Sequence, residues 1–320
     1  MKAMLIGGAG FVGKHLAIHL ANTYGWEIVI TGLPEEREAI ERSSLGRFIP
    51  VNILEKGQIQ AVLEQERPHY IFHLAAQSSV ARSWKNPQAT IDVNIKGCAN
   101  LLDAIRSIEI YDPKILLIGS GDEYGRLPGG IRGVSETTLP CPGNPYAMTK
   151  AAQTMLGQVY AHAYRMHIVL ARPFNHIGPG QMAGFVVSDF CKQVAEILNG
   201  AEPVVRVGNL TASRDFTDVR DVVRAYGLLI QHGVPGEIYN IGSGTAVSIQ
   251  SLLDEIIRQS GISISVQHDP QKFRPVDYPS IAADISKLQR AIDWKPEISL
   301  ERTIADTLTD WQIRLKNKVN

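Results

Sequence analysis

The sequence predicts an α/β fold, in which a doubly wound parallel sheet is joined to a smaller mixed α/β C-terminal domain. Three observations predict it. Short apolar runs alternate with longer amphipathic stretches through the first half of the chain, as expected when helices cover both faces of a parallel sheet. A glycine-rich segment, residues 7–13, directly follows the first apolar run. After Arg172 the alternation becomes irregular, which indicates the second domain.

Six short segments are expected to form the strands of this sheet, because each is rich in β-branched or apolar residues and is bounded by Gly, Pro or polar residues. In chain order they are residues 3–6, 27–31, 47–51, 70–74, 114–118 and 167–171. Helical stretches lie between them, and two of these are expected to be long, over residues 87–107 and 146–164. The second begins just after Gly143-Asn144-Pro145, a sequence that suits a turn into a helix.

The remaining elements are shorter and mixed in type. We expect a helix over residues 185–198, a strand over 204–207, a helix from a cap at Asp218 to residue 232, a strand over 237–241, and helices that open at Ser248 and near Asp284 and Glu301. This pattern divides the chain in two. Residues 1–174 with 216–243 are expected to form the larger domain, and residues 175–215 with 244–320 the smaller one.

The composition excludes several classes of protein. Thirty-two basic residues balance 32 acidic ones, so no net charge attracts the protein to nucleic acid or to an anionic membrane surface. The apolar runs are too short for a signal peptide or a membrane span, and a cytoplasmic location is expected. Cys98, Cys141 and Cys191 are widely separated and lack Cys-x-x-Cys spacing, so we expect neither a disulfide framework nor a metal site.

The glycine-rich segment predicts a dinucleotide-binding loop of the Rossmann type. Gly7, Gly10 and Gly13 lie between a predicted strand and a predicted helix, which is the setting that such a site requires. Glycines let the backbone turn tightly and approach a pyrophosphate, whose charge meets free amides and the positive end of the helix dipole. Phe11 and Val12, at the expected helix start, belong to the same site.

The second strand suggests which dinucleotide is bound. An acidic residue at its end would accept the ribose hydroxyls of NAD, but Thr31-Gly32-Leu33 stands there instead. This favours NADP(H), with NAD(H) as the alternative. Arg37 and Arg42 would meet the extra phosphate if their loop folds back, and a solvated charged loop is an equal alternative.

Three residues are candidates for the chemistry. Tyr146 and Lys150 are four residues apart on a predicted helix and therefore share one face. A phenol transfers protons poorly at neutral pH, and a nearby ammonium is expected to lower its pKa by favouring the phenolate. Ser120 follows a predicted central strand, at the edge where ligands of open α/β sheets bind, and its hydroxyl can hold a reacting oxygen.

With these residues the chain resembles the extended short-chain dehydrogenase/reductase family, whose catalytic set is a glycine-rich loop, a Ser or Thr, and Tyr-x-x-x-Lys. The likeness covers nearly the whole chain and includes His73-Leu74-Ala75-Ala76. It implies further residues around the cofactor: Asn52, Ile53, Leu74, Ala75, Ala76, Asn94 and Pro173. It also implies a homodimer, or a tetramer, in which the helices near Asn94 and Tyr160 pack against a second copy.

Within that family, residues 172–181 look like the GDP-4-keto-6-deoxy-mannose reductases, which act on a GDP-linked sugar. The resemblance implies that Asn175, Arg214 and Arg274 contact the diphosphate of a nucleotide sugar, a role that suits bidentate guanidinium groups. A salt bridge to Asp215 or Asp277 is the alternative for either arginine. The other expected substrate contacts are Ser78, Gly121, Asp122, Phe185 and Val186.

The strand end at Ser120 distinguishes two reactions. The related GDP-mannose 4,6-dehydratases carry Thr-x-Glu there, with the glutamate as the base at C5, whereas this chain has Ser120-Gly121-Asp122 and a glutamate one residue later, Glu123. A catalytic group displaced by about 1 Å can lose roughly a hundredfold in rate. Reduction of a 4-keto sugar is therefore favoured over dehydration. A 4-epimerase and a non-catalytic dinucleotide sensor are the remaining alternatives.

Overall fold

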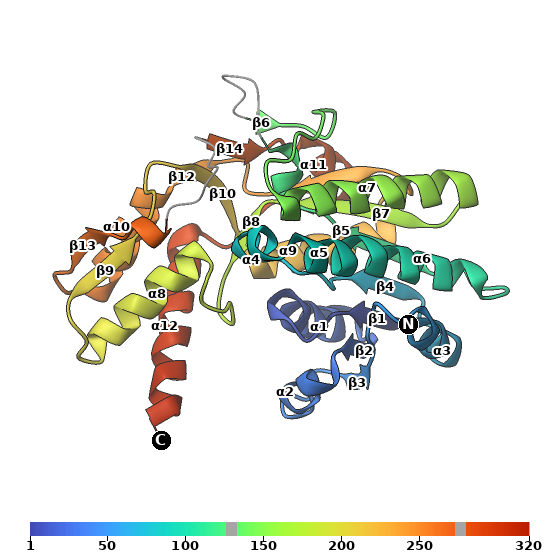
Figure 1. Cartoon of the computed structure of the whole chain (residues 1–320), viewed down its shortest axis with the longest axis horizontal. Coiled ribbons are helices and arrows are strands. Elements are labelled where there is room, and N and C mark those ends of the chain that lie inside the picture. Colours follow the sequence, from blue (N-terminus) through green and yellow to red (C-terminus); the bar gives the residue numbers. More distant parts are fainter. Residues whose placement is uncertain (126–132, 273–279, 320) are drawn as a thin grey trace.

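The computed structural model describes residues 1–125, 133–272 and 280–319, and its central element is a seven-stranded parallel sheet (Figure 1). The strand order is β3-β2-β1-β4-β5-β7-β11, so the winding reverses between β1 and β4. This is the doubly wound sheet that the alternating apolar runs predict. Its strands are β1 (Lys2–Ile6), β2 (Glu27–Gly32), β3 (Arg47–Pro50), β4 (Tyr70–His73), β5 (Lys114–Ile118), β7 (Ile168–Pro173) and β11 (Ile238–Ile241).

Helices cover both faces of this sheet. On one face pack α1 (Phe11–Tyr24), α9 (Val219–His232) and α11 (Ser286–Ile292), and on the other α3 (Lys56–Glu66), α6 (Gly97–Ser107) and α7 (Pro145–Tyr164). Leu16 and Leu20, four residues apart on α1, are fully buried against the sheet. Four short elements connect these layers: η1 (Pro34–Glu36), α2 (Arg37–Glu41), α4 (Val80–Lys85) and η3 (Gly121–Tyr124).

The long helix expected over residues 87–107 has an irregular turn in its middle. It consists of α5 (Pro87–Ile91), a π-helical turn η2 (Asp92–Lys96), and α6. A π turn inserts one residue into the helix and frequently marks a functional site. The fully buried Asn94 lies in this turn, so the irregularity aims its side chain at the neighbouring helix α7.

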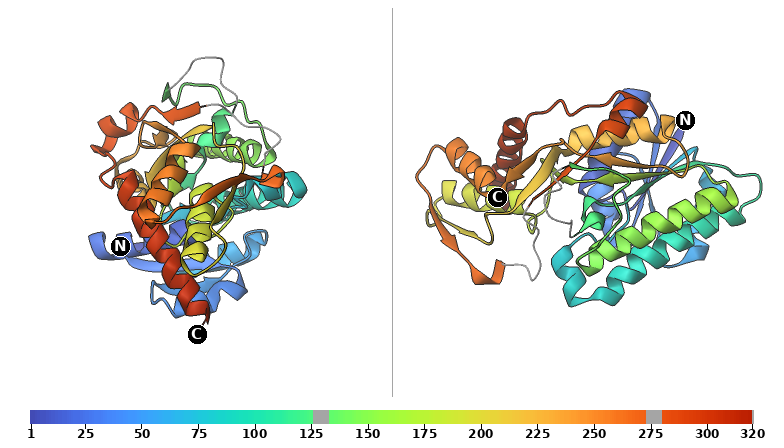
Figure 2. Two further views of the ribbon diagram at one scale, coloured as in Figure 1. Left: turned by 90° about the vertical axis from the view of Figure 1, so that its left-hand side faces the viewer. Right: turned by 90° about the horizontal axis from the view of Figure 1, so that it is seen from above.

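A smaller lobe, most of it from the second half of the chain, lies beside the sheet (Figure 2). A five-stranded sheet has the order β12-β10-β14-β6, with β8 also paired to β10, and β9 pairs with β13. These strands are β6 (Gly133–Val134), β8 (Asn175–Ile177), β9 (Val204–Val207), β10 (Ser213–Asp218), β12 (Ala246–Ser248), β13 (Ser265–His268) and β14 (Ser280–Ala283). Three helices pack together to form its core: α8 (Val186–Leu198), α10 (Ile249–Ser260) and α12 (Leu300–Val319). A short turn, η4 (Pro270–Lys272), follows β13.

Most strands of this lobe were missed by the sequence prediction, which has only β9 among them. β10 reads Ser-Arg-Asp-Phe-Thr-Asp, and all four residues of β13 are exposed, so neither shows the apolar alternation of a half-buried strand. The predicted helix caps are confirmed, since Asp218 and Ser248 accept hydrogen bonds from backbone amides in the first turns of α9 and α10.

Two kinds of feature, membrane-spanning helices and metal-binding clusters, are absent from the described residues. No helix in residues 1–125, 133–272 or 280–319 is long and apolar enough to cross a membrane. Within the same ranges, no group of three or more His, Cys, Asp or Glu side chains could hold a metal ion.

Candidate active site

The glycine loop lies where the winding of the sheet reverses, at the carboxyl ends of β1 and β4. Gly7 has a φ of +75°, and a Cβ there would come within 2.5 Å of the Ala75 backbone, so the loop after β4 passes directly over it. The amides of Gly7 and Gly8 donate to the Thr31 carbonyl at 2.9 and 3.0 Å, which fixes the loop on β2. Gly10 then caps α1. The first-turn amides of α1 are thereby directed at the space that a pyrophosphate needs.

The other predicted cofactor residues line the same edge of the sheet. Leu74 directly follows β4, and its amide donates to the Ile6 carbonyl at 2.9 Å. Asn52 follows β3, where its side-chain oxygen accepts the Leu54 amide at 3.0 Å. Ile53 is buried beneath it and Pro173 ends β7. Ala75 and Ala76 are half-buried. The structure brings these residues to one edge, and their contacts with a cofactor remain predictions.

Ser120, Tyr146 and Lys150 come together at the adjoining strand end. Asn144 caps α7 by accepting the Ala147 amide at 2.8 Å, which starts the helix so that Tyr146 and Lys150 face the end of β5. The Ser120 hydroxyl lies close enough to the Tyr146 phenol to act on its pKa, which it lowers. The buried Lys150 ammonium donates to the Ile118 carbonyl at 2.7 Å and to Gln153 Oε1 at 3.1 Å.

The electrostatics of this site differ from the sequence prediction. Burial, together with the negative charge of Asp122, raises the pKa of the Tyr146 phenol, and the Ser120 hydroxyl opposes this only in part. The expected lowering of the Tyr146 pKa by Lys150 is therefore wrong. Burial also lowers the pKa of Lys150 to about 8, although Glu123 and Cys98 act in the opposite direction. Tyr146 thus holds its proton at neutral pH, which suits a proton donor.

Glu123 is turned away from the site. Its carboxylate is fully buried, accepts the Ser120 amide at 2.8 Å and the Thr154 hydroxyl at 3.0 Å, and forms a salt bridge with Arg172 at 2.8 Å. Every strong acceptor position of this carboxylate is directed into the core. Asp122 is half-buried, and its negative charge raises the pKa of Tyr146 more than the charge of Glu123 does.

Asn94 connects the loop after β4 with helix α7 through hydrogen bonds. Its side-chain oxygen accepts the Gln77 amide at 2.8 Å, and its amide nitrogen donates to the Gln77 carbonyl at 3.2 Å and to the Thr149 hydroxyl at 2.9 Å. Thr149 in turn donates to the Tyr146 carbonyl at 2.7 Å. Asn94 therefore has a positioning role, and a direct contact with the cofactor remains a prediction.

The described substrate candidates lie after β4 and β5, on β8 and β10, and at the start of α8. Asn175 donates to the Asp215 carbonyl at 3.2 Å, and Arg214, on β10, donates to the Ser213 carbonyl at 2.8 Å. Ser78 and Phe185 are exposed, Val186 begins α8, and Gly121 packs under the Phe174 ring. The Asp215 carboxylate accepts the amides of Ser243, Gly244 and Ala283. Arg274 and Asp277 lie outside the described residues.

Three residues near the site were missed or left without a role by the sequence analysis. Gln153 carries no signal beyond its place one turn after Lys150, yet it is fully buried and bonded to that ammonium. His73 is also fully buried, and neither ring nitrogen has a hydrogen-bond partner among the described residues. Burial and the charge of Lys150 lower the pKa of His73 to about 3, so it is neutral. The third is Glu36, in η1. Its carboxylate accepts the Leu33 amide just after the end of β2.

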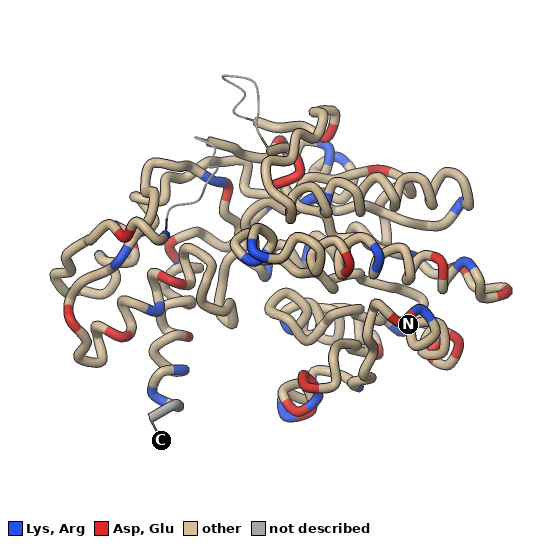
Figure 3. The backbone as a smooth tube through the Cα atoms, in the orientation of Figure 1, with Lys and Arg blue, Asp and Glu red and all other residues tan. Residues whose placement is uncertain are grey.

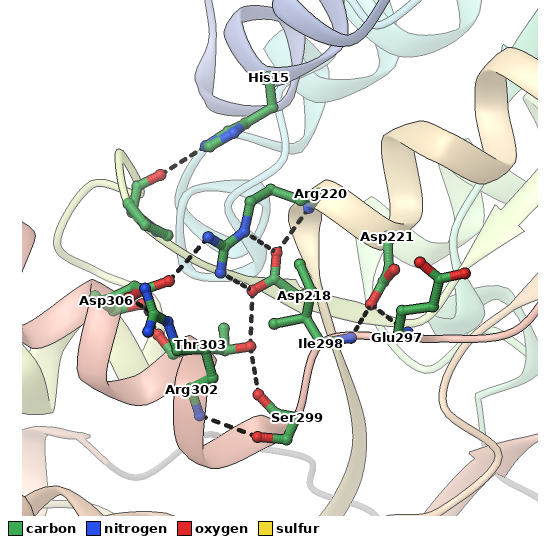
Figure 4. Close-up of polar contacts among 12 residues, drawn as sticks. His15, Asp218, Arg220, Asp221, Glu297, Ile298, Ser299, Arg302, Thr303 and Asp306 are labelled. Carbon is green, nitrogen blue, oxygen red and sulfur yellow. Dashed lines mark hydrogen bonds and ion pairs between the residues drawn. The ribbon is translucent and has the colours of Figure 1, made fainter. Parts of the chain in front are cut away.

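A polar network connects the glycine-loop helix α1 with the smaller lobe (Figure 4). His15 bonds to the Pro179 carbonyl at 2.7 Å. Nearby, Asp218 accepts two bonds from the Arg220 guanidinium and one from the Thr303 hydroxyl of α12. Arg220 reaches Asp306 on the same helix at 2.8 Å. His15 thus connects the loop after β8 to α1, while Asp218 and Arg220 connect the start of α9 to α12.

Comparisons with known proteins agree with this geometry. Residues 4–307 match the family described as GDP-mannose 4,6 dehydratase. The chain is 31% identical over 319 residues to GDP-6-deoxy-D-mannose reductase of Pseudomonas aeruginosa, and the match covers 99% of each chain. The structure of RMD from the same organism, complexed with NADPH, has a TM-score of 0.87 at 31% identity over 98% of this chain and 100% of that one.

The fold is shared by enzymes with another reaction. The NAD complex of UDP-glucose 4-epimerase from Thermus thermophilus has a TM-score of 0.85 at 28% identity and covers 98% of this chain and 99% of that one. The fold alone thus does not select one reaction. The assembly of Ser120, Tyr146 and Lys150 agrees with the family match. The chain belongs to the GDP-mannose 4,6 dehydratase family of extended short-chain dehydrogenases/reductases, as the family match and the relatives show.

Proposed function

We propose that the protein reduces the C4 ketone of a GDP-4-keto-6-deoxyhexose, converting GDP-4-keto-6-deoxy-D-mannose to GDP-D-rhamnose in the cytoplasm. The observation that carries this proposal is the position of Glu123. A dehydratase needs a base at C5, and the carboxylate next to Asp122 is engaged by Arg172, Thr154 and a backbone amide in the core. The set that suffices for reduction, the half-buried Ser120 and Tyr146 with the buried Lys150, is intact.

Each of the three residues has a defined task. The reduced nicotinamide dinucleotide supplies the hydride. Tyr146, protonated at neutral pH, donates its proton to the C4 oxygen as that oxygen gains charge, and the Ser120 hydroxyl holds the oxygen in place. Lys150 already uses two of its three N–H groups on Ile118 and Gln153, so the third is left for a ribose hydroxyl of the cofactor.

The substrate is proposed from the relatives and from the chemistry of the smaller lobe. The Pseudomonas aeruginosa protein is named for a GDP-linked deoxymannose. In this chain Asn175 and Arg214 lie on the paired strands β8 and β10, and with Arg274 they would hold the diphosphate. We also propose that residues 1–174 with 216–243 bind the dinucleotide, and residues 175–215 with 244–320 the sugar nucleotide.

The direct test is incubation with GDP-4-keto-6-deoxy-D-mannose and NADH or NADPH. We expect the 340 nm absorbance of the cofactor to fall as GDP-D-rhamnose forms. No loss of absorbance at saturating substrate excludes the reductase. Water loss from GDP-mannose alone, with Asp122 as the base, would identify a dehydratase. Interconversion of sugar nucleotides by copurified NAD would identify an epimerase, and cofactor binding without any turnover a sensor.

The reductase should lose activity as the pH rises through about 8. Lys150 has a pKa of about 8 in the folded protein, below the ordinary value of 10.5 for lysine, because it is buried. Above that pH the amine keeps the two N–H groups that it donates to Ile118 and Gln153, and it loses the third, which is proposed to donate to the cofactor. We therefore expect kcat/KM, which reports groups of the free enzyme, to fall tenfold per pH unit on the alkaline side. A flat kcat/KM from pH 7 to 10 would contradict this role.

The proposed assembly is a homodimer through α6 and α7. These helices lie side by side on the outside of the molecule (Figure 2). Lys150 is the only Lys, Arg, Asp or Glu of α7, and it is buried, while Met155 and Val159 are about half exposed on its outer face. Such a face suits an interface between two copies.

The variant Met155→Glu should convert the dimer to a monomer, because it places a charge on each side of the interface. Light scattering coupled to size-exclusion chromatography measures the mass. Ile18→Glu, on an exposed position of α1, is the matched control and should leave the mass unchanged. A wild-type protein that elutes with the mass of one chain, 35.2 kDa, would contradict the proposed dimer.

A further inference from the structure

The end of β2 is in direct contact with the glycine loop. Thr31 and Gly32 are buried there, and the Thr31 carbonyl accepts the amides of both Gly7 and Gly8. In dinucleotide-binding sheets of this topology, the side chain at the end of the second strand faces the ribose of the adenosine half. A charged group at this strand end therefore decides whether that ribose may carry a phosphate.

Glu36 occupies this place, although it comes four residues after Gly32. The chain turns back through η1, and the Glu36 carboxylate accepts the Leu33 amide at 2.7 Å. One of its oxygens lies so close to the position that a Cβ on Gly32 would take that the two would collide. The absence of a side chain at Gly32 thus makes room for a carboxylate supplied from further along the chain.

The two nearby arginines are engaged by other glutamates. Arg37 pairs with Glu41 at 3.1 Å, and Arg42 pairs with Glu38, in both cases four residues apart along the chain. Acidic and basic positions follow one another closely around α2 (Figure 3). Residues 34–42 hold four glutamates against two arginines, a net charge of −2. A segment with this balance repels a phosphate more than it attracts one.

We propose that Glu36 selects NAD(H) over NADP(H) as the cofactor of this enzyme. Its carboxylate accepts hydrogen bonds from the 2′- and 3′-hydroxyls of the adenosine ribose, and its charge opposes a 2′-phosphate. The proposal rests on the proposed function only in requiring that a nicotinamide dinucleotide binds at the glycine loop. It replaces the preference for NADP(H) that the residues Thr31-Gly32-Leu33 suggest when they are considered without the fold.

The test is a binding measurement without any sugar nucleotide. The cofactor-free protein is titrated with NADH and with NADPH, and nicotinamide fluorescence gives each Kd. We expect NADH to bind the wild type at least tenfold more tightly. Glu36→Gln keeps the size of the side chain but removes the charge, so NADH should bind more weakly, NADPH more tightly, and the ratio should fall tenfold or more.

Matched variants separate this role from a general charge effect. Glu35→Gln removes the same charge from an exposed neighbour and should leave the ratio unchanged. Glu36→Asp, whose carboxylate is one methylene shorter, should lose NADH affinity while it keeps the charge. Melting temperatures show that each variant is folded. The proposal is overturned if NADPH binds the wild type as tightly as NADH does, or if Glu35→Gln changes the ratio as much as Glu36→Gln.

The outcome is independent of the sugar substrate. If the Kd ratio behaves as expected but no 4-keto sugar is reduced, the proposed reaction fails and the role of Glu36 stands. If the sugar is reduced with NADPH as readily as with NADH and the ratio is near one, the reaction stands and the role of Glu36 fails.

Discussion

Tyr146→Phe should abolish turnover while leaving cofactor binding nearly unchanged. The variant removes one oxygen atom, the one proposed to donate the proton to the forming alkoxide, and leaves the rest of the ring in place. A positioned general acid contributes roughly 10²- to 10⁴-fold to the rate, and we expect kcat to fall by about that factor. The measurement is cofactor oxidation with the 4-keto sugar at saturation, together with the Kd of NADH by fluorescence.

The matched control is Tyr164→Phe, on the same helix but half exposed at its far end. It should retain wild-type kcat. If Tyr146→Phe reduces as fast as the wild type, the proton comes from another group, and Asp122 is the first to examine because it lies close enough to influence the phenol. A large loss of NADH affinity in Tyr146→Phe would show instead that the phenol acts mainly in binding.

The parts of the fold that depend on local sequence were predictable. All six strands expected in the first half are present within two residues of their expected ends, because a buried parallel strand is a short apolar run bounded by turn residues. The glycine loop, Ser120, Tyr146 and Lys150 were found for a similar reason. Each has a fixed spacing from the strand or helix that presents it, so the element and the motif confirm one another.

The parts of the fold that depend on pairing between distant residues were not predictable from the sequence. β8 and β10 pair over a separation of about 40 residues, and their sequences are too polar to indicate strands. The role of Glu36 depends on a 3₁₀ turn that reverses the chain onto β2, which no periodicity indicates. The direction of Glu123 depends on Arg172, 49 residues further along the chain. In each case the deciding partner is distant in sequence.

The buried pair of Glu123 and Arg172 connects stability with the choice of reaction. The guanidinium of Arg172 lies 4.5 Å from the centre of the Tyr124 ring and is almost completely buried, so the charge of each partner is compensated mainly by the other. Because the carboxylate also accepts the Ser120 amide, it fixes the backbone at the strand end that carries the Ser120 hydroxyl. The carboxylate next to the position of the dehydratase base therefore serves here to position a residue of the reductase.

Glu123→Gln should destabilise the protein strongly, and Asp122→Asn should not. Removing the charge of Glu123 leaves the Arg172 guanidinium buried and unpaired, which costs about 3–5 kcal/mol of the free energy of unfolding. Asp122 is half-buried, so its neutralisation should cost less than about 1 kcal/mol. Denaturant unfolding followed by circular dichroism measures both. Comparable losses for the two variants would contradict the structural role of Glu123.

The double variant Glu123→Gln/Arg172→Met separates the pair from its surroundings. Once both charges are gone, no unpaired ion is left in the core, so the double variant should be more stable than the sum of the single losses predicts by about 1–3 kcal/mol. Activity provides the second measurement. If Glu123 acts only by positioning Ser120, Asp122→Asn and Glu123→Gln should both retain some ketone reduction, and neither should gain the ability to remove water from GDP-mannose. Additive losses of stability in the double variant would show that Glu123 and Arg172 act independently, and the strand end would then be held by the hydrogen bonds of Ser120 and Thr154 alone.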